Sequence, residues 1–124
     1  MPTIVHFDIP VDDIERAKKF YEDLFNWSIK KVPGEMPYYL IETTDLDGKA
    51  SLGGGMAKRE KAGQHITNFI GVSSIDKYID RIEALGGKVL EPKTPIVGWG
   101  YLAVCLDTEN NMFGLWEDDK NATM

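Results

Sequence analysis

The chain has 124 residues, of which 43% are hydrophobic and 27% charged, which is typical of one soluble globular domain. Its formal net charge of −6 argues against nucleic acid or an anionic membrane as the main partner, because phosphate recognition needs clustered Lys and Arg. No apolar run approaches the roughly 20 residues of a membrane-spanning helix, and no signal peptide is visible at the N-terminus, so a cytoplasmic location is expected.

The first half of the chain predicts one helix among four strands. Residues 3–9 are rich in β-branched and aromatic side chains and predict a strand that ends at Pro10. Asp12 and Glu15 have the spacing of a helix N-cap and capping box, and apolar residues follow at helical spacing as far as Phe25. Three more strands are expected at residues 27–32, 38–43 and 50–56, with turns at Pro33-Gly34 and Asp47-Gly48.

The second half repeats this order. A shift of about 61 residues places Val11 on Val72 and Ile14 on Ile75 without a gap. The repeat predicts a strand at residues 66–72, a helix capped by Ser73 and stopped at Gly86-Gly87, and strands at residues 88–91, 99–106 and 112–116.

Each half therefore reads β-α-β-β-β, and the fold class expected is α+β. Residues 1–124 are interpreted as a single domain, with modules at about 3–56 and 66–117 joined by the linker 57–65. Two such modules side by side can curl their sheets into a cup with the helices outside, and a cup is a natural ligand cavity. The one cysteine, Cys105, lies in an apolar run, where a buried thiol is favoured over a nucleophile.

Three stretches resemble a known family. They are "HFDIPVDDIERAKKFYEDLFNW", "RIEALGGKV" and "DTENNMFGLWE", and they resemble the vicinal oxygen chelate (glyoxalase/bleomycin resistance protein/dioxygenase) superfamily, most closely a poorly characterised glyoxalase-related branch. The resemblance covers about residues 3–117. It implies a homodimer and a site in the cup, but the family hosts several reactions and also metal-free binding proteins, so it predicts a fold better than a reaction.

The resemblance also implies four metal-ligand positions, on the first and fourth strands of each module. They fall on His6, Gly54, Thr67 and Gly114. Glycine offers no side-chain ligand, whereas a catalytic zinc generally takes three protein ligands. These four residues therefore do not form an intact metal site of the family's kind. We expect no resident cofactor, and a bound divalent metal is the less favoured alternative.

The cup is expected to present a histidine and several aromatic rings to a ligand. His6 is the candidate catalytic residue, because an imidazole can act as an acid or base near neutral pH, although a hydrogen-bonded structural histidine is the competing interpretation. Aromatic faces bind apolar or planar ligands, but core packing is the alternative for each ring. The candidate ligand-binding residues are His6, Thr67, Tyr101, Trp99, Tyr39 and Glu42.

Three functions fit these observations. The first is a small-molecule-binding protein that sequesters its ligand or uses His6 in metal-free acid–base chemistry. The second is a metal-dependent lyase, isomerase or dioxygenase in which Asp8, Glu42 and His65 replace the lost ligands beside His6. The third is a non-catalytic interaction module.

Overall fold

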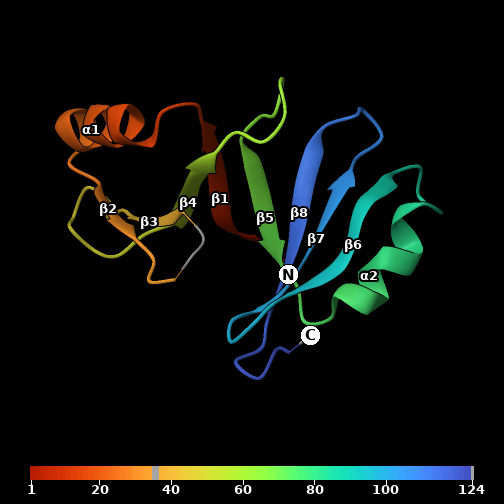
Figure 1. Ribbon diagram of the computed structural model, residues 1–124. Coiled ribbons are helices and arrows are strands. Elements are labelled where there is room, and N and C mark those ends of the chain that lie inside the picture. Colours follow the sequence, from red (N-terminus) through yellow and green to blue (C-terminus); the bar gives the residue numbers. More distant parts are fainter. Residues whose placement is uncertain (35–36, 124) are drawn as a thin grey trace. The chain divides into compact units, whose positions relative to one another are not determined.

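The computed structural model describes residues 1–34 and 37–123, and the predicted α+β class is confirmed there by eight strands and two helices (Figure 1). The chain forms two compact units, residues 6–66 and residues 1–5 with 67–124. We call them the first and second modules. The curling of their sheets into one cup stays a prediction.

The first module is a four-stranded sheet with one helix. Its strands lie in the order β2-β3-β4-β1; β1 is parallel to β4, and the other neighbours are antiparallel. The elements are β1 (Ile4–Val11), α1 (Ile14–Phe25), β2 (Ser28–Lys31), β3 (Tyr38–Glu42) and β4 (Gly53–Lys58).

The second module repeats this topology. Its strand order is β5-β8-β7-β6, and β5 is parallel to β8. Its elements are β5 (Thr67–Gly71), α2 (Ile75–Ile82), β6 (Lys88–Ile96), β7 (Gly100–Leu106) and β8 (Met112–Asp118). The two helices begin 61 residues apart, at Ile14 and Ile75, which is the offset seen in the sequence.

Both helices begin one residue later than predicted. Asp13, and not Asp12, caps α1, and its carboxylate accepts the backbone N–H of Arg16 at 3.1 Å. In α2 the N-cap is Ser74, and not Ser73, and among the described residues its side chain makes no capping hydrogen bond. Glu117 on β8 replaces that cap, because its Oε1 accepts the backbone N–H of Ile75 at 2.8 Å.

Two strands also continue through prolines, beyond their predicted ends. β1 includes Pro10 and ends at Val11. β6 continues through Pro92 and Pro95 to Ile96. β6 is the last strand of its module in the hydrogen-bonded order, and an edge strand tolerates proline because one side of its backbone needs no donor.

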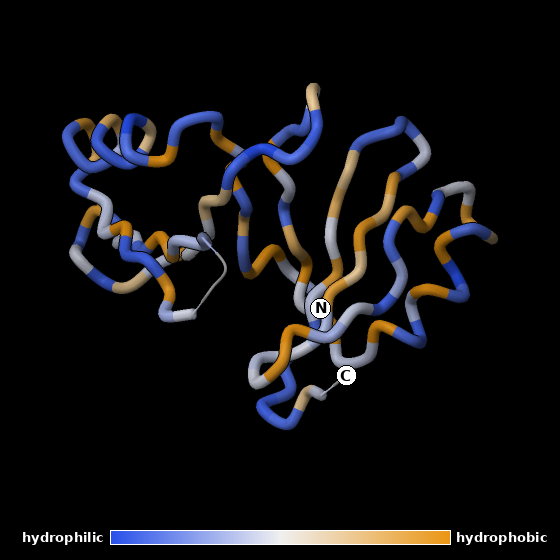
Figure 2. The backbone as a smooth tube through the Cα atoms, viewed as in Figure 1, coloured by the Kyte–Doolittle hydropathy of each residue, from blue (hydrophilic) through white to orange (hydrophobic). Residues whose placement is uncertain are grey.

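Each module has its own hydrophobic core on the face of its sheet that packs against its helix. Figure 2 shows apolar residues alternating with polar ones along both helices. The first core consists of Ile9, Val11, Ile29, Ile41 and Met56, and the second of Val72, Ile75, Ala103 and Leu115. Cys105 is fully buried, as expected, and burial raises the pKa of its thiol.

Neither helix in the described part of the chain is long and apolar enough to span a membrane.

The cap supplied by Glu117 generates a stability prediction. Glu117→Ala removes the acceptor of the Ile75 N–H and should lower the unfolding free energy by about 1 kcal/mol, which is a fall of roughly 4 °C in Tm. Calorimetry or thermal circular dichroism measures the change. Ser74→Ala is the matched control and should alter Tm by much less; equal losses in the two variants would contradict the assignment of the cap to Glu117.

Candidate functional site

Strand alternation sorts the side chains of the first module between two faces. Ile9 and Val11 on β1 belong to the core beside α1, so His6 and Asp8 project from the opposite face. On β3, Tyr39 packs against the core, which places Tyr38 on the same face as His6. We call this surface the open face of the first module.

Three side chains on the open face form one hydrogen-bonded cluster. The Tyr38 hydroxyl donates to Asp8 Oδ1 at 2.6 Å. His6 Nε2 lies 2.9 Å from the same carboxylate oxygen and 2.8 Å from the Tyr38 oxygen. We call these residues the His6–Asp8–Tyr38 cluster. It joins an imidazole, a carboxylate and a phenol within direct hydrogen-bonding distance.

A glycine makes room for this cluster. In the β1–β4 ladder Asp8 lies opposite Gly55. A Cβ at Gly55 would overlap the Tyr38 hydroxyl and would lie 2.7 Å from Asp8 Oδ1. The phenol therefore reaches Asp8 by lying across bare backbone, and any side chain at this position would push it away.

The environment of Tyr38 keeps its hydroxyl protonated. Burial, the negative charge of Asp8 and the hydrogen bond to Asp8 all raise the pKa of Tyr38. Since the phenol is neutral and donates its proton to Asp8, its oxygen can only accept from His6. Both atoms near Nε2 are then acceptors, and we infer that the imidazole carries a proton on Nε2.

The cluster is partly open to solvent. The side chains of His6 and Asp8 are 30% and 37% exposed, so a small molecule can reach the imidazole and the carboxylate. Such a set can bind a ligand through hydroxyl or carbonyl oxygens and can exchange a proton with it.

The structure separates the other candidates of the first module from this cluster. Tyr39 is packed into the core under α1. Glu42 lies on the same face of β3 as Tyr38, but it is exposed at the far end of the strand, four residues away. His65 is exposed beyond β4. A Cβ at Gly54 would strike the Phe7 ring, which packs against the core, so this position faces α1 and not His6. The residue opposite His6 in the ladder is Gly53.

The second module has different chemistry at the matching places. Thr67 is buried, and its hydroxyl donates to Met112 Sδ at 3.5 Å. A Cβ at Gly114 would overlap the Phe69 ring, so a ring covers this glycine as Tyr38 covers Gly55.

The two aromatic candidates of the second module lie apart from its open side. Tyr101 packs against the core on the α2 face, with Lys93 Nζ 4.4 Å from its ring centroid. Trp99 is 53% exposed and precedes β7. The ligand-binding roles predicted for Tyr39 and Tyr101 would therefore use the helix faces of their sheets.

The residues present do not fit the divalent metal centre that the resemblance implies. Its four positions supply one usual ligand, His6, beside two glycines and Thr67. Within residues 1–34 and 37–123, no three His, Cys, Asp or Glu side chains lie close enough together to bind one ion. Of the alternative ligands considered from the sequence, only Asp8 joins His6.

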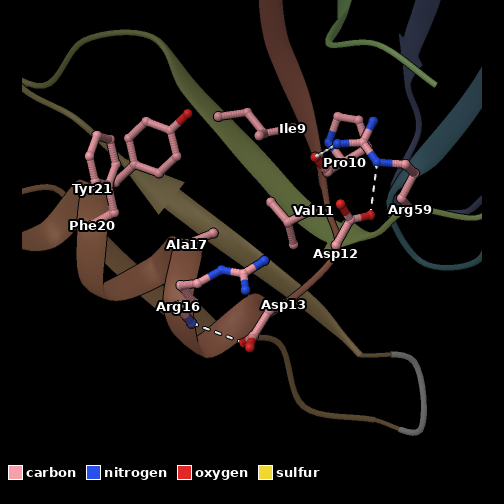
Figure 3. Close-up of a pocket in the computed structure, with 10 residues that line it drawn as sticks. All are labelled: Ile9, Pro10, Val11, Asp12, Asp13, Arg16, Ala17, Phe20, Tyr21 and Arg59. Atoms are coloured by element: carbon pink, nitrogen blue, oxygen red, sulfur yellow. Dashed lines mark hydrogen bonds and ion pairs between the residues drawn. The ribbon is translucent and has the colours of Figure 1, made fainter. Parts of the chain in front are cut away.

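A groove of about 420 Å³ lies on the α1 side of the first module (Figure 3). It is separate from the cluster, because its strand residues Ile9 and Val11 face α1. The lining residues are Ile9, Pro10, Val11, Asp12, Asp13, Arg16, Ala17, Phe20, Tyr21 and Arg59.

Sequence reasoning missed Tyr38 and Gly55. The spacing of His6 and Asp8 on one strand already placed them on one face. Tyr38 is next to Tyr39 in the sequence. Choosing between them requires knowing which face of β3 packs against α1, and the sequence does not reveal this. The role of Gly55 can be recognised only when its partner across the β1–β4 ladder, Asp8, is known.

Comparison with known proteins agrees with this fold. The sequence model of the Glyoxalase/Bleomycin resistance protein/Dioxygenase superfamily matches residues 3–115. A Mycobacterium bovis protein named "Putative glyoxylase CFP32" is 27% identical over 117 residues, which are 92% of this chain and 45% of that protein. The chain thus spans about half the length of the curated relatives it matches.

Solved structures share the fold at low sequence identity. Streptomyces coelicolor methylmalonyl-CoA epimerase in complex with 2-nitronate-propionyl-CoA superposes with a TM-score of 0.70 at 15% identity, covering 98% of both chains. A hypothetical protein from Bacillus halodurans gives a TM-score of 0.66 at 15% identity, covering 99% of both chains.

The buried phenol generates a pH prediction. Because the pKa of Tyr38 is raised in the folded protein, its contribution to stability is fully present below the ordinary tyrosine value of about 10 and is lost as the pH rises above it. Between about pH 9 and pH 11, wild type should therefore lose up to about 1.4 kcal/mol more unfolding free energy than Tyr38→Phe. Urea unfolding across this range measures both, and Tyr39→Phe should keep the wild-type slope. A Tyr38→Phe slope equal to that of wild type would contradict the account.

The bare backbone under Tyr38 generates a second prediction. Gly55→Ala should displace the Tyr38 ring and cost about 1–3 kcal/mol of unfolding free energy. Gly53→Ala is the control, since the nearest described atom to its Cβ would be the Ile41 carbonyl oxygen at 3.1 Å, and it should cost less. Urea unfolding measures stability, and ultraviolet titration should show Tyr38 ionising nearer its ordinary pKa in Gly55→Ala. An unchanged titration would mean that the glycine does not hold the phenol in place.

Proposed function

Since the chain belongs to the Glyoxalase/Bleomycin resistance protein/Dioxygenase superfamily, we propose that it binds a small molecule on the open face of the first module without a protein-bound metal. The observation that carries this proposal is the His6–Asp8–Tyr38 cluster, in which three hydrogen-bonding groups converge within 2.9 Å of one another. The open face is the surface that would line the predicted cup.

The exposed atoms of the cluster favour an oxygen-bearing ligand. Asp8 keeps a second carboxylate oxygen that can accept a hydroxyl proton, and His6 is accessible over about a third of its side chain. Beside them, Gly53 offers backbone without a side chain, directly opposite His6. A small hydroxy or carbonyl compound can lie flat on this backbone while its oxygens contact the cluster.

The same cluster supports acid–base chemistry. Asp8 and Tyr38 accept the Nε2 proton of His6. The imidazole would exchange a proton with the bound ligand, and the Asp8 carboxylate would stabilise the imidazolium form. Returning the proton to a neighbouring ligand atom completes an isomerisation. Tyr38, being neutral, orients Asp8 and adds no competing charge.

The proposal is tested by native mass spectrometry on untagged protein prepared without chelators, followed by a thermal-shift screen of small hydroxy and carbonyl compounds. We expect wild type to carry no stoichiometric metal and to gain stability with a subset of these compounds, by about 2.7 kcal/mol at a concentration of 100 times Kd.

Two histidine variants locate the binding site. His6→Gln should abolish the stabilisation, whereas His65→Gln, at an exposed position, should keep it. One metal ion per chain that is lost in His6→Gln would contradict the proposal in favour of a metalloenzyme. Equal effects of the two substitutions would remove His6 from the site.

A further inference from the structure

The groove on the α1 side is apolar at one end and charged at the other. Figure 3 shows the rings of Phe20 and Tyr21 together with Ile9 at the apolar end. The charged lining residues gather at the other end, and they are Asp12, Asp13, Arg16 and Arg59. The volume of about 420 Å³ is in the range of small-molecule sites. The groove therefore suits a small ligand that has an apolar body and a charged head.

The apolar end leaves hydrocarbon surface in contact with water. Phe20 is 58% exposed, although its ring meets the Tyr21 ring edge-on with 5.3 Å between the centroids. Ile9 and Val11 also line the groove, and each of them is only 7% exposed. A ligand that covers the outer face of Phe20 would remove apolar surface from water without disturbing the core beneath it.

Arg16 supplies a cation to the charged end. Within residues 1–34 and 37–123, the ion pairs include Arg59 but not Arg16. The backbone N–H of Arg16 caps the helix through Asp13, which leaves its guanidinium out of that contact. Figure 3 shows this side chain extending from α1 toward Val11. A guanidinium in this position can bind a carboxylate through two parallel N–H···O bonds.

The second arginine is already bound to the chain and positions a carboxylate. Nε of Arg59 donates to Asp12 Oδ1 at 3.0 Å. Its other two nitrogens donate to the carbonyl oxygens of Pro10 and Gln64. Asp12 is nevertheless 70% exposed, and its Oδ2 accepts no hydrogen bond from the described residues. This oxygen can therefore accept an ammonium group while Arg59 holds the carboxylate in place.

We propose that the α1 groove is a second ligand site, which binds a small apolar α-amino acid in its zwitterionic form. The ligand carboxylate pairs with Arg16, its ammonium group pairs with Asp12, and its side chain covers Phe20. A simple anion would meet the carboxylate of the groove, and a simple amine would meet the guanidinium, so a ligand that carries both charges complements the groove best. This inference goes beyond the proposed function, because the groove lies on the opposite face of the sheet from the cluster.

The test is a titration of the full chain with L-phenylalanine, followed by amide chemical shifts in NMR spectra. We expect saturable shifts at Val11, Arg16 and Ala17, which line the groove, and none at His6 on the other face. Three probes each lack one part of the ligand: 3-phenylpropionate the ammonium group, phenethylamine the carboxylate, and glycine the apolar body. Each should bind about tenfold more weakly. Equal binding of L-phenylalanine and 3-phenylpropionate would overturn the assignment of a zwitterion.

Variants that remove one charge test the two polar contacts. Arg16→Gln removes the cation, and Asp12→Asn removes the negative charge but keeps an oxygen that can accept from Arg59. Each should weaken L-phenylalanine binding about tenfold, with Tm close to wild type. The matched controls are Arg81→Gln and Asp80→Asn, at exposed positions on α2, and they should bind like wild type. No shift at the groove in wild type, or binding insensitive to both groove variants, would overturn the proposal.

Discussion

The candidate site depends on the absence of a side chain at Gly55. Parallel pairing of β1 with β4 sets this glycine opposite Asp8, and the Tyr38 hydroxyl occupies the space that a Cβ would take. The phenol can then donate to Asp8 while its oxygen meets His6. Backbone pairing, one missing side chain and strand alternation together bring three separate polar groups into one cluster.

The two modules use one architecture for different chemistry. In the first, a phenol covers Gly55; in the second, the Phe69 ring covers Gly114. Under the 61-residue shift Asp8 corresponds to Phe69, and His6 corresponds to the buried Thr67. The repeat has therefore kept its strand order, its helix start and a glycine covered by a ring, whereas the residues of the second module that match His6 and Asp8, Thr67 and Phe69, are not ionisable. This asymmetry supports the proposal that polar recognition belongs to the first module.

The sequence predicted the order of elements and the repeat, because hydrophobic periodicity and helix starts are local signals. It placed both caps one residue early and ended β6 at its first proline, since the edge position of that strand is a tertiary property. His6 was predicted as the candidate catalytic residue, and Asp8 was considered only as a ligand of a relocated metal site. The choice of Tyr38 over Tyr39, and of Gly53 and Gly55 over Gly54, depended on which face of β3 and β4 meets the helix. The packing of Tyr39 and Met56 against the first core settles that, and the ladder register then identifies the residues opposite His6 and Asp8.

We propose that the open face of the first module binds small oxygen-bearing molecules through the cluster. Chemical-shift mapping by NMR on isotope-labelled protein, titrated with small hydroxy and carbonyl compounds, tests this most directly. The account predicts that the largest shifts converge on His6, Asp8, Tyr38 and the backbone amides of Gly53 and Gly55. Shifts confined to the α1 groove, or saturable binding that leaves the His6 and Tyr38 signals unmoved, would contradict it.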